Sequence, residues 1–210
     1  MKQLHEDLWQ SAKYSSGILN THAYFLRRPE GNVLFYNTGF DDDLQTIAEL
    51  GGIEFQLLTH RDESGPSLQV IKARFGAKLG CSALEVPMIG QDAQVDLIFE
   101  PTVTQLGDIK IIHTPGHTDG SVCYFYKSPH GKSYLFTGDT FFQWNGEWSV
   151  FVMPSAGGSE TALAESLQKL RDLEPDVVMS SGFVGEVAMV EPTRDEWIVA
   201  IDKQIASLTK

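Results

Sequence analysis

Three residues that could bind a metal ion each follow an apolar run of the sequence. His60 comes after FQLLT, His117 lies in TPGHTDGS after IKII, and Asp139 comes after YLFTG. Taken singly, a histidine at a strand end is usually a hydrogen-bonded surface residue, and an aspartate before a threonine is often a turn cap. Together, two imidazoles and one carboxylate form the donor set of a mononuclear metal site, and this mixture of nitrogen and oxygen donors suits Zn, Fe or Mn.

The apolar runs read as β-strands, and ligand sites of layered α/β proteins are usually assembled at strand ends. In the first half, the patterns predict a hairpin over 22–39, a helix over 41–50, a buried strand over 53–59 and a helix over 66–75. Pro66 suits the first position of that last helix, and Ser64 or Gly65 would precede it as the cap. His60 would then lie in the connection between a strand and a helix.

The second half is rich in strands and ends in helices. The predicted elements are a short strand in 77–86, a meander of strands 96–100, 102–106 and 108–114, hairpins 121–140 and 141–151, helix 159–173, strand 175–182 and helix 191–208. Ser159 is placed to cap its helix. Two β-rich halves with helices predict a layered α/β protein, with sheets inside and helices outside, as a single domain over 1–210.

Composition narrows the class of partner. The chain has 210 residues, of which 42% are hydrophobic, and this suits one domain with a substantial core. Its net charge of −12 makes nucleic acid a poor partner, and a small-molecule substrate is expected. No apolar run is long enough to cross a bilayer, and the polar start MKQLHEDLWQ has no signal-peptide pattern. We therefore expect no membrane association and a cytoplasmic protein, with Cys81 and Cys123 as reduced thiols.

The order of the motifs NVLFYNTG, LLTH, TPGHTDGS and LFTGDT, followed by a strand ending in SSG, resembles the metallo-β-lactamase fold superfamily. The similarity runs over nearly the whole chain, and TPGHTDGS and FTGDT closely match the third and fourth motifs of that family. The resemblance implies an αββα four-layer sandwich, with the metal site at one edge between the two sheets. It also implies that Asp139 corresponds to the carboxylate that bridges two ions in the family, and that His113 is structural.

The chain departs from the family pattern in a consistent way. Aligned on His60, the family's first motif, H-x-H-x-D-H, has its other three ligand positions at Asp62, Ser64 and Gly65. The family's final histidine ligand, which follows a late strand, corresponds to Phe183. The resemblance therefore implies that the ligands of one ion are kept, with Asp62 as a replacement, and that those of the second ion are lost. We expect one divalent ion or none, with these ligands: His60, Asp62, His117 and Asp139.

The leading functional hypothesis is a metal-dependent hydrolase. In such an enzyme the ion lowers the pKa of a water molecule, which then attacks an ester, thioester, amide or lactone carbonyl. Asp139 or Asp62 would orient that water or accept its proton. Glu63 is a further candidate base, but a solvent-exposed charge of the loop is the stronger interpretation of this residue. The aromatic residues after Asp139, Trp144 and Trp148 among them, either pack on the buried face of a hairpin or line a substrate cleft.

Two other functions remain open, as does the oligomeric state. One is a mononuclear Fe(II) dioxygenase of a sulfur substrate. The persulfide dioxygenases of the superfamily use the positions of His60, His117 and Asp139, although they keep the rest of the first motif. The other is a metal-free binding or scaffold protein, because the lost ligands remove one ion site and a fold does not fix a function.

Overall fold

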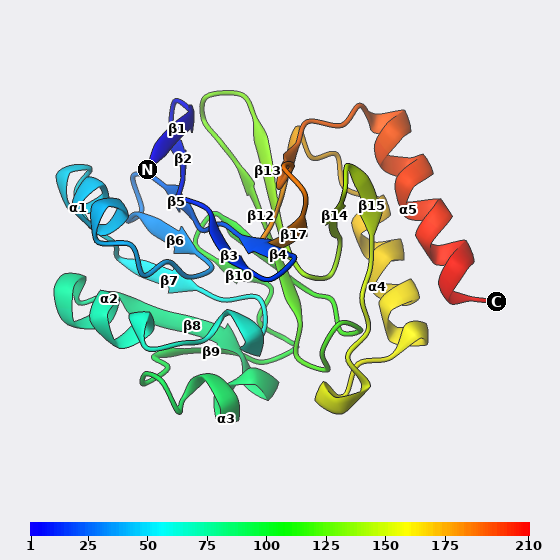
Figure 1. Cartoon of the computed structure of the whole chain (residues 1–210), viewed down its shortest axis with the longest axis horizontal. Helices are drawn as coiled ribbons and strands as arrows, with labels where there is room; N and C mark the ends of the chain where they lie inside the picture. Colours follow the sequence, from blue (N-terminus) through cyan, green and yellow to red (C-terminus); the bar gives the residue numbers. More distant parts are fainter.

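Two β-sheets face each other in the middle of the protein, and helices cover their outer sides (Figure 1). The computed structural model describes all residues, 1–210. The first sheet has seven strands in this spatial order: β1 (Lys2–His5), β2 (Leu8–Gln10), β5 (Tyr24–Leu26), β6 (Val33–Phe35), β7 (Phe55–Leu57), β8 (Lys78–Ser82) and β9 (Leu97–Phe99). Strands β6 to β9 are parallel, so their carboxyl ends lie at the same edge.

The second sheet has six strands in this order: β10 (Gln105–Leu106), β11 (Ile109–His113), β12 (Val122–Lys127), β13 (Ser133–Gly138), β16 (Val177–Ser180) and β18 (Met189–Val190). Strands β11 and β12 are antiparallel, and the loop between them contains His117. Strands β13 and β16 are parallel neighbours, so the residues that follow them, Asp139 and Ser181, lie side by side.

Five helices form the two outer layers. Helices α1 (Asp41–Glu49), α2 (Ser67–Phe75) and α3 (Val86–Ile89) lie on the side of the first sheet, and α4 (Glu160–Arg171) and α5 (Arg194–Leu208) lie on the side of the second (Figure 1). The Ser159 side chain caps α4, as predicted. At the start of α5 the structure also has a capping box, formed by Thr193 and Glu196. By length and hydropathy, none of the helices could span a membrane.

Aromatic side chains fill the space between the two main sheets. Phe35 of the first sheet stacks on Phe136 of the second, with ring centroids 3.6 Å apart, and Tyr124 packs against Phe35 at 5.5 Å. A separate apolar cluster, which includes Leu163 and Trp197, joins α4 and α5 to the outer face of the second sheet. These layers confirm the expected αββα four-layer sandwich.

A third, smaller sheet lies beside the two main ones and was not foreseen from the sequence. Its five strands are β15 (Glu147–Ser149), β14 (Phe142–Trp144), β17 (Gly182–Val184), β4 (Leu19–Thr21) and β3 (Tyr14–Ser16). The pairing of β4 with β17 joins the N-terminal part of the chain to its C-terminal half. This sheet carries the β3–β4 hairpin to the edge where the predicted ligands lie.

Two details predicted from the sequence are wrong, one strand pairing and one helix cap. Strand 96–100 is not part of a meander, because β9 pairs in parallel with β8 in the first sheet, whereas β10 and β11 pair in the second. Periodicity identifies a strand but does not choose its partner, and here α3 supplies the crossover that a parallel pair needs. Helix α2 begins at Ser67 after Pro66, and neither Ser64 nor Gly65 caps it.

Candidate metal centre

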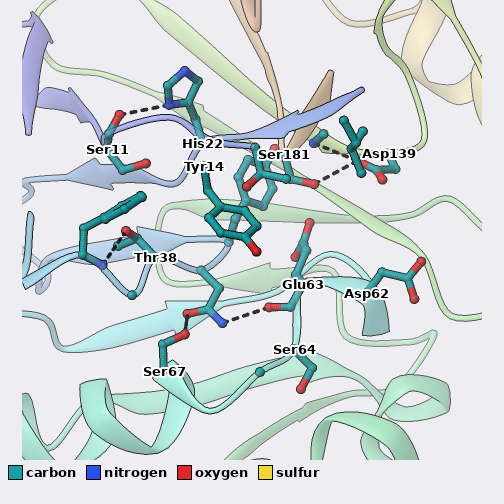
Figure 2. Close-up of a pocket in the computed structure, with 18 of the residues that line it drawn as sticks. Ser11, Tyr14, His22, Thr38, Asp62, Glu63, Ser64, Ser67, Asp139 and Ser181 are labelled. Atoms are coloured by element: carbon teal, nitrogen blue, oxygen red, sulfur yellow. Dashed lines mark hydrogen bonds between the residues drawn. The ribbon is translucent and has the colours of Figure 1, made fainter. Parts of the chain in front are cut away.

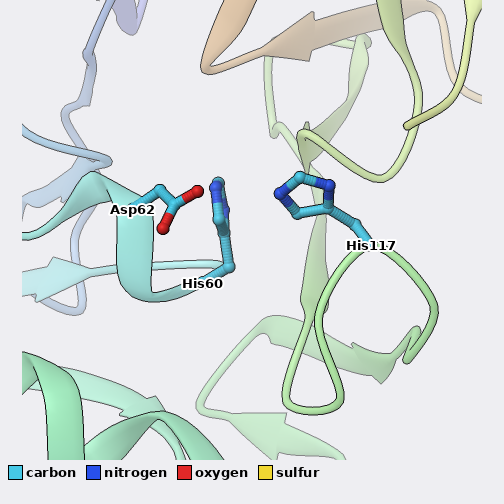
Figure 3. A group of neighbouring side chains, drawn as sticks. All are labelled: His60, Asp62 and His117. Atoms are coloured by element: carbon cyan, nitrogen blue, oxygen red, sulfur yellow. The ribbon is translucent and has the colours of Figure 1, made fainter. Parts of the chain in front are cut away.

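Three of the predicted ligands lie together at the edge where the two main sheets meet. His60 follows β7, Asp62 lies in the 3-10 helix η1 (Arg61–Glu63), and His117 lies in the β11–β12 loop. One donor atom from each side chain lies within 4.8 Å of the other two (Figure 3). The two imidazole rings are nearly perpendicular, with centroids 4.7 Å apart. This spacing puts three donor atoms within reach of a single ion.

Hydrogen bonds behind the ring fix His60. Its Nδ1 lies 3.0 Å from the Thr59 hydroxyl, and that hydroxyl donates its own proton to the Glu63 carboxylate. Nδ1 therefore donates to Thr59, and in the neutral ring Nε2 carries the lone pair. His60 is 1% exposed, and its Nε2 has no hydrogen-bond partner.

His117 is held in the same way. Its Nδ1 donates to the backbone carbonyl of Phe151 at 2.8 Å, which leaves Nε2 as the acceptor. His117 is 2% exposed, and its Nε2 also lacks a partner. An unsatisfied buried polar atom costs about 1–3 kcal/mol. A histidine whose far nitrogen is hydrogen-bonded and whose near nitrogen is open is the usual arrangement of a metal ligand, so the two residues fit a divalent ion.

Asp139 offers one free carboxylate oxygen beside these rings. Its Oδ1 accepts hydrogen bonds from the Ser181 hydroxyl and the Gly182 amide, both at 2.9 Å. Its Oδ2 lies 3.6 Å from His60 Nε2, which is beyond hydrogen-bond range. A Cβ at position 182 would come within 2.8 Å of Oδ1, so glycine there lets the backbone approach the carboxylate closely. Oδ1 is thus a fixed anchor, and Oδ2 faces His60.

Asp62 differs from the other three because it is exposed to solvent. Its carboxylate lies on the side of the His60 ring opposite His117 in the projection of Figure 3. No hydrogen bond ties it to a neighbour, so it can turn toward an ion or toward a substrate.

The charges of the site depend on each other. Burial opposes the charged form of His60, but the carboxylates of Glu63 and Asp139 outweigh it and raise the pKa of His60 to about 9. Burial and the neighbouring His60 lower the pKa of His117. Burial would raise the pKa of Asp139, but the two histidines outweigh it and lower that pKa. At neutral pH the metal-free site therefore carries a proton on His60, a neutral His117 and a charged Asp139.

The positions where the family has the second ion's ligands are occupied by residues with other contacts. The Ser64 hydroxyl donates to Asp92 at 2.6 Å, and Gly65 has no side chain. Phe183 is fully buried and stacks on the ring of His22, with centroids 5.3 Å apart. None of the three directs a donor atom at His60 or His117.

A cavity of about 550 Å³ opens next to the candidate ligands (Figure 2). His60, Asp62 and Asp139 line it, and so do Ser64 and Gly65. The cavity therefore extends into the region that the missing ligands would otherwise occupy. Its volume is within the range of small-molecule sites.

An ion-pair network holds the loops that carry the candidate ligands, and it was not foreseen from the sequence. Arg61 binds Glu85 through Nε at 2.5 Å and also pairs with Asp119. Glu85 is fully buried and accepts a further hydrogen bond from the Thr118 hydroxyl at 2.6 Å. We call Arg61, Glu85, Thr118 and Asp119 the loop clamp. It joins the residue after His60 to the residues after His117.

The expectation that Glu63 is a solvent-exposed loop charge is wrong. Its side chain is 5% exposed, and its two oxygens bind the hydroxyl and the backbone amide of Thr59. In a run as polar as HRDES, the sequence pattern gives no signal that one carboxylate turns inward. The spacing of three residues from His60, which places Glu63 Oε1 3.3 Å from Nδ1, is the feature that could have indicated it.

Three other side chains that the sequence singled out do not line the cavity. Trp148 stacks on Phe141 with centroids 4.5 Å apart and does not line the cavity, and the exposed Trp144 does not line it either. His113 lies with its Nε2 3.1 Å from the carbonyl of Val103, away from the candidate ligands. The contacts of Trp148 agree with the packing interpretation and those of His113 with the structural one, whereas Trp144, which is 45% exposed, neither packs on a buried face nor lines the cavity.

Comparison with protein families identifies the chain. The family model described as the metallo-beta-lactamase superfamily matches residues 67–182, more than half of the chain. The chain belongs to the metallo-β-lactamase superfamily. The matched range contains His117 and Asp139 and begins after His60 and Asp62, in line with a superfamily member whose first motif has diverged.

Solved structures of the superfamily share the fold. The metallo-β-lactamase from Pontibacter korlensis aligns with a TM-score of 0.70 at 15% identity, covering 100% of this chain and 98% of that one. TTHA1623 in a di-iron-bound form aligns with a TM-score of 0.67 at 22% identity, covering 86% of this chain and 94% of that one.

One relative is similar in sequence. A hydroxyacylglutathione hydrolase of Acidiphilium cryptum (strain JF-5) is 30% identical over 144 residues, which are 66% of this chain. The match covers 54% of that relative, so the chain spans about half its length.

Proposed function

We propose that this metallo-β-lactamase superfamily member is a metal-dependent hydrolase that uses one divalent ion. His60, Asp62 and His117 would hold the ion, with Asp139 Oδ2 as a further ligand or proton acceptor. The observation that carries the proposal is the pair of buried Nε2 atoms without partners, each on a ring whose tautomer is set by a hydrogen bond at Nδ1. Ser64, Gly65 and Phe183 supply no ligands for a second ion.

A bound divalent ion would polarise a carbonyl group and make a water molecule acidic enough to react near neutral pH. The chain's own residues would do the rest. Asp139, anchored through Oδ1, would accept a proton on Oδ2 and hold it close to His60. The exposed Asp62 would orient the water or the substrate from the solvent side, and the cavity would hold the rest of the substrate.

We infer an acyl compound as the substrate, with an ester, thioester, amide or lactone carbonyl. The partial similarity to a hydroxyacylglutathione hydrolase supports a thioester as the first compound to test. Because the match covers 54% of that relative, we propose for this chain only the thioester class and not the relative's own substrate.

The test is elemental analysis of protein purified without chelator, with a thioesterase assay that detects the released thiol. The native chain and a His113→Ala control should each hold one Zn or Mn ion and cleave thioesters. His117→Ala should lose most of the metal and the activity. No ion in the native chain, even after reconstitution, would contradict the proposal and favour a non-catalytic binding protein.

A second candidate is a mononuclear Fe(II) dioxygenase of a sulfur substrate. It is favoured by the nature of the donors, because two histidines and the free oxygen of Asp139 match the two-histidine, one-carboxylate set of such enzymes. One Fe per chain and oxygen consumption with a persulfide substrate would support this candidate against the hydrolase.

A further inference from the structure

Negative charges outnumber positive ones among the residues that line the cavity, where the protonated His60 of the metal-free chain is the one cation. Its 21 lining residues include three carboxylates, Asp62, Glu63 and Asp139, and no lysine or arginine. His22 also lines it, but burial lowers the pKa of His22, so the ring adds no positive charge near neutral pH. Three carboxylates also exceed the charge of one divalent ion.

The basic residues nearest in sequence are engaged elsewhere. Arg61 follows His60, but its guanidinium binds Glu85 and Asp119 of the loop clamp. Lys13 follows the lining residue Ala12, but its ammonium pairs with Glu186 at 3.5 Å. A carboxylate or phosphate on a substrate would therefore meet no lysine or arginine among the residues that line this cavity.

The mouth of the cavity is aromatic and apolar. Tyr14 of β3, Leu19 of β4 and Phe40, which precedes α1, all line it and are 58%, 40% and 37% exposed. The rings of Tyr14 and Phe40 lie 6.5 Å apart at an interplanar angle of 54°. Aromatic faces bind alkylammonium groups through cation–π interactions. The cavity thus combines an acidic floor, a buried His60 nitrogen without a partner, and an aromatic rim.

We propose that this cavity selects substrates whose non-reacting end carries a cationic ammonium group, and that it discriminates against anionic ends such as a carboxylate. The selectivity deepens the proposed hydrolase function and rests on it. The acidic floor attracts the cation, the rings of Tyr14 and Phe40 contact it, and the candidate metal ligands at the inner side of the cavity face the acyl carbonyl.

The first experiment compares three thioesters of one thiol on the metal-loaded chain. Their acyl groups are 4-(trimethylammonio)butanoyl, its uncharged carbon isostere 5,5-dimethylhexanoyl, and the anionic glutaryl group. We expect kcat/KM to fall in that order, with about tenfold between cation and anion, since electrostatic and cation–π contributions are of that order. Equal rates, or faster cleavage of the glutaryl thioester, would overturn the inference.

A binding measurement separates this inference from the hydrolase proposal. Calorimetry with 3-phenylpropyltrimethylammonium and 3-phenylpropane-1-sulfonate reports charge preference without catalysis. Tighter binding of the ammonium compound together with no cleavage of any thioester would support the charge selectivity and contradict the hydrolase. Cleavage of thioesters together with equal or tighter binding of the sulfonate would support the hydrolase and contradict the charge selectivity.

A pair of matched variants locates the effect. Leu19→Lys places a cation on the rim, whereas Ile18→Lys adds the same charge at the neighbouring residue, which is 69% exposed and does not line the cavity. We expect Leu19→Lys to reduce the preference for the ammonium thioester about fivefold. Ile18→Lys should leave the preference unchanged. The same effect in both variants would mean that overall charge, and not this cavity, sets the preference, which would overturn the inference.

Discussion

Glu63 fixes the Nδ1 edge of the His60 ring, which points away from the candidate metal. Its Oε1 lies 3.3 Å from His60 Nδ1, and both of its oxygens are also fixed by Thr59, at 2.5 and 2.7 Å. A carboxylate behind an imidazole fixes the ring orientation and makes the other nitrogen a stronger metal ligand. Glu63 is therefore a positioning residue and not the general base.

Replacing Glu63 with glutamine tests this role. The amide keeps the size of the side chain but removes the charge that raises the pKa of His60. Measured above pH 9, where His60 is neutral in both chains and proton competition drops out, Glu63→Gln should weaken metal binding about 10- to 100-fold, as is typical for such outer carboxylates. Competition against a chromophoric chelator measures the change, with the exposed Glu165→Gln as the matched control. Unchanged affinity, with the pKa of His60 still near 9, would contradict the role.

The protonation of His60 predicts how metal binding depends on pH. Its pKa is raised from 6.5 to about 9, so the metal-free chain carries a proton there at neutral pH, whereas the pKa of His117 is lowered. A metal ion can bind His60 only when that proton leaves. The same raised pKa stabilises the metal-free fold fully below pH 6.5, and this contribution is lost as the pH rises through about 9.

We therefore expect metal affinity to rise with pH, by about tenfold per unit between pH 7 and 8.5, with about one proton released per ion bound. Calorimetry in buffers of different ionisation enthalpy counts the released protons, and a chelator-buffered titration gives the affinity. A pH-independent affinity over this range would show that His60 is already neutral in the metal-free chain.

At the scale of elements, the loop clamp keeps η1 and the β11–β12 loop together. Glu85, at the end of the 3-10 helix η2 (Ala83–Glu85), receives hydrogen bonds from both sides, from Arg61 and from Thr118. The two loops carry His60, Asp62 and His117, so their relative position sets the distances between the candidate ligands.

Glu85→Gln removes the buried charge of the clamp and keeps its shape. We expect a loss of about 2 kcal/mol in the free energy of unfolding, because Arg61 keeps only its partly exposed partner Asp119. Metal affinity should fall as well. Glu54→Gln, which breaks an exposed pair with Lys78, should cost less than about 0.5 kcal/mol in urea unfolding. Equal losses in the two variants would contradict a role for the clamp.

The sequence predicts the layers and the strand ends well, because apolar runs that stop at a polar residue mark where a buried strand leaves the core. His60, His117 and Asp139 all follow this rule. It does not predict that β9 joins the first sheet, because the choice of partner depends on crossovers. Nor does it indicate that Glu63 turns inward, because the orientation of one side chain in a polar run leaves no periodic signal. The loop clamp is missed because it depends on contacts between segments far apart in the chain.

At the scale of the whole molecule, the candidate ligands come from both halves of the chain. His60 and Asp62 follow the first sheet, whereas His117 and Asp139 extend from the second. Tyr36, at the end of β6, also crosses between the sheets: its hydroxyl donates to the Met179 carbonyl and accepts from the Gly138 amide. With a shared aromatic core and the β4–β17 pairing, we propose that residues 1–210 unfold as one domain.

A metal ion bound between the halves should therefore stabilise the whole chain and not one loop. An ion that binds only the folded state adds about 2.7 kcal/mol when its free concentration is 100 times Kd, which corresponds to roughly 5–10 °C in Tm for a chain of this size. We expect one thermal transition that moves upward by this amount with Zn and returns with a chelator. His117→Ala should show no such shift, whereas His113→Ala should behave like the native chain. A metal-dependent shift that persists in His117→Ala would place the stabilising ion elsewhere, and two separate transitions would contradict the single domain.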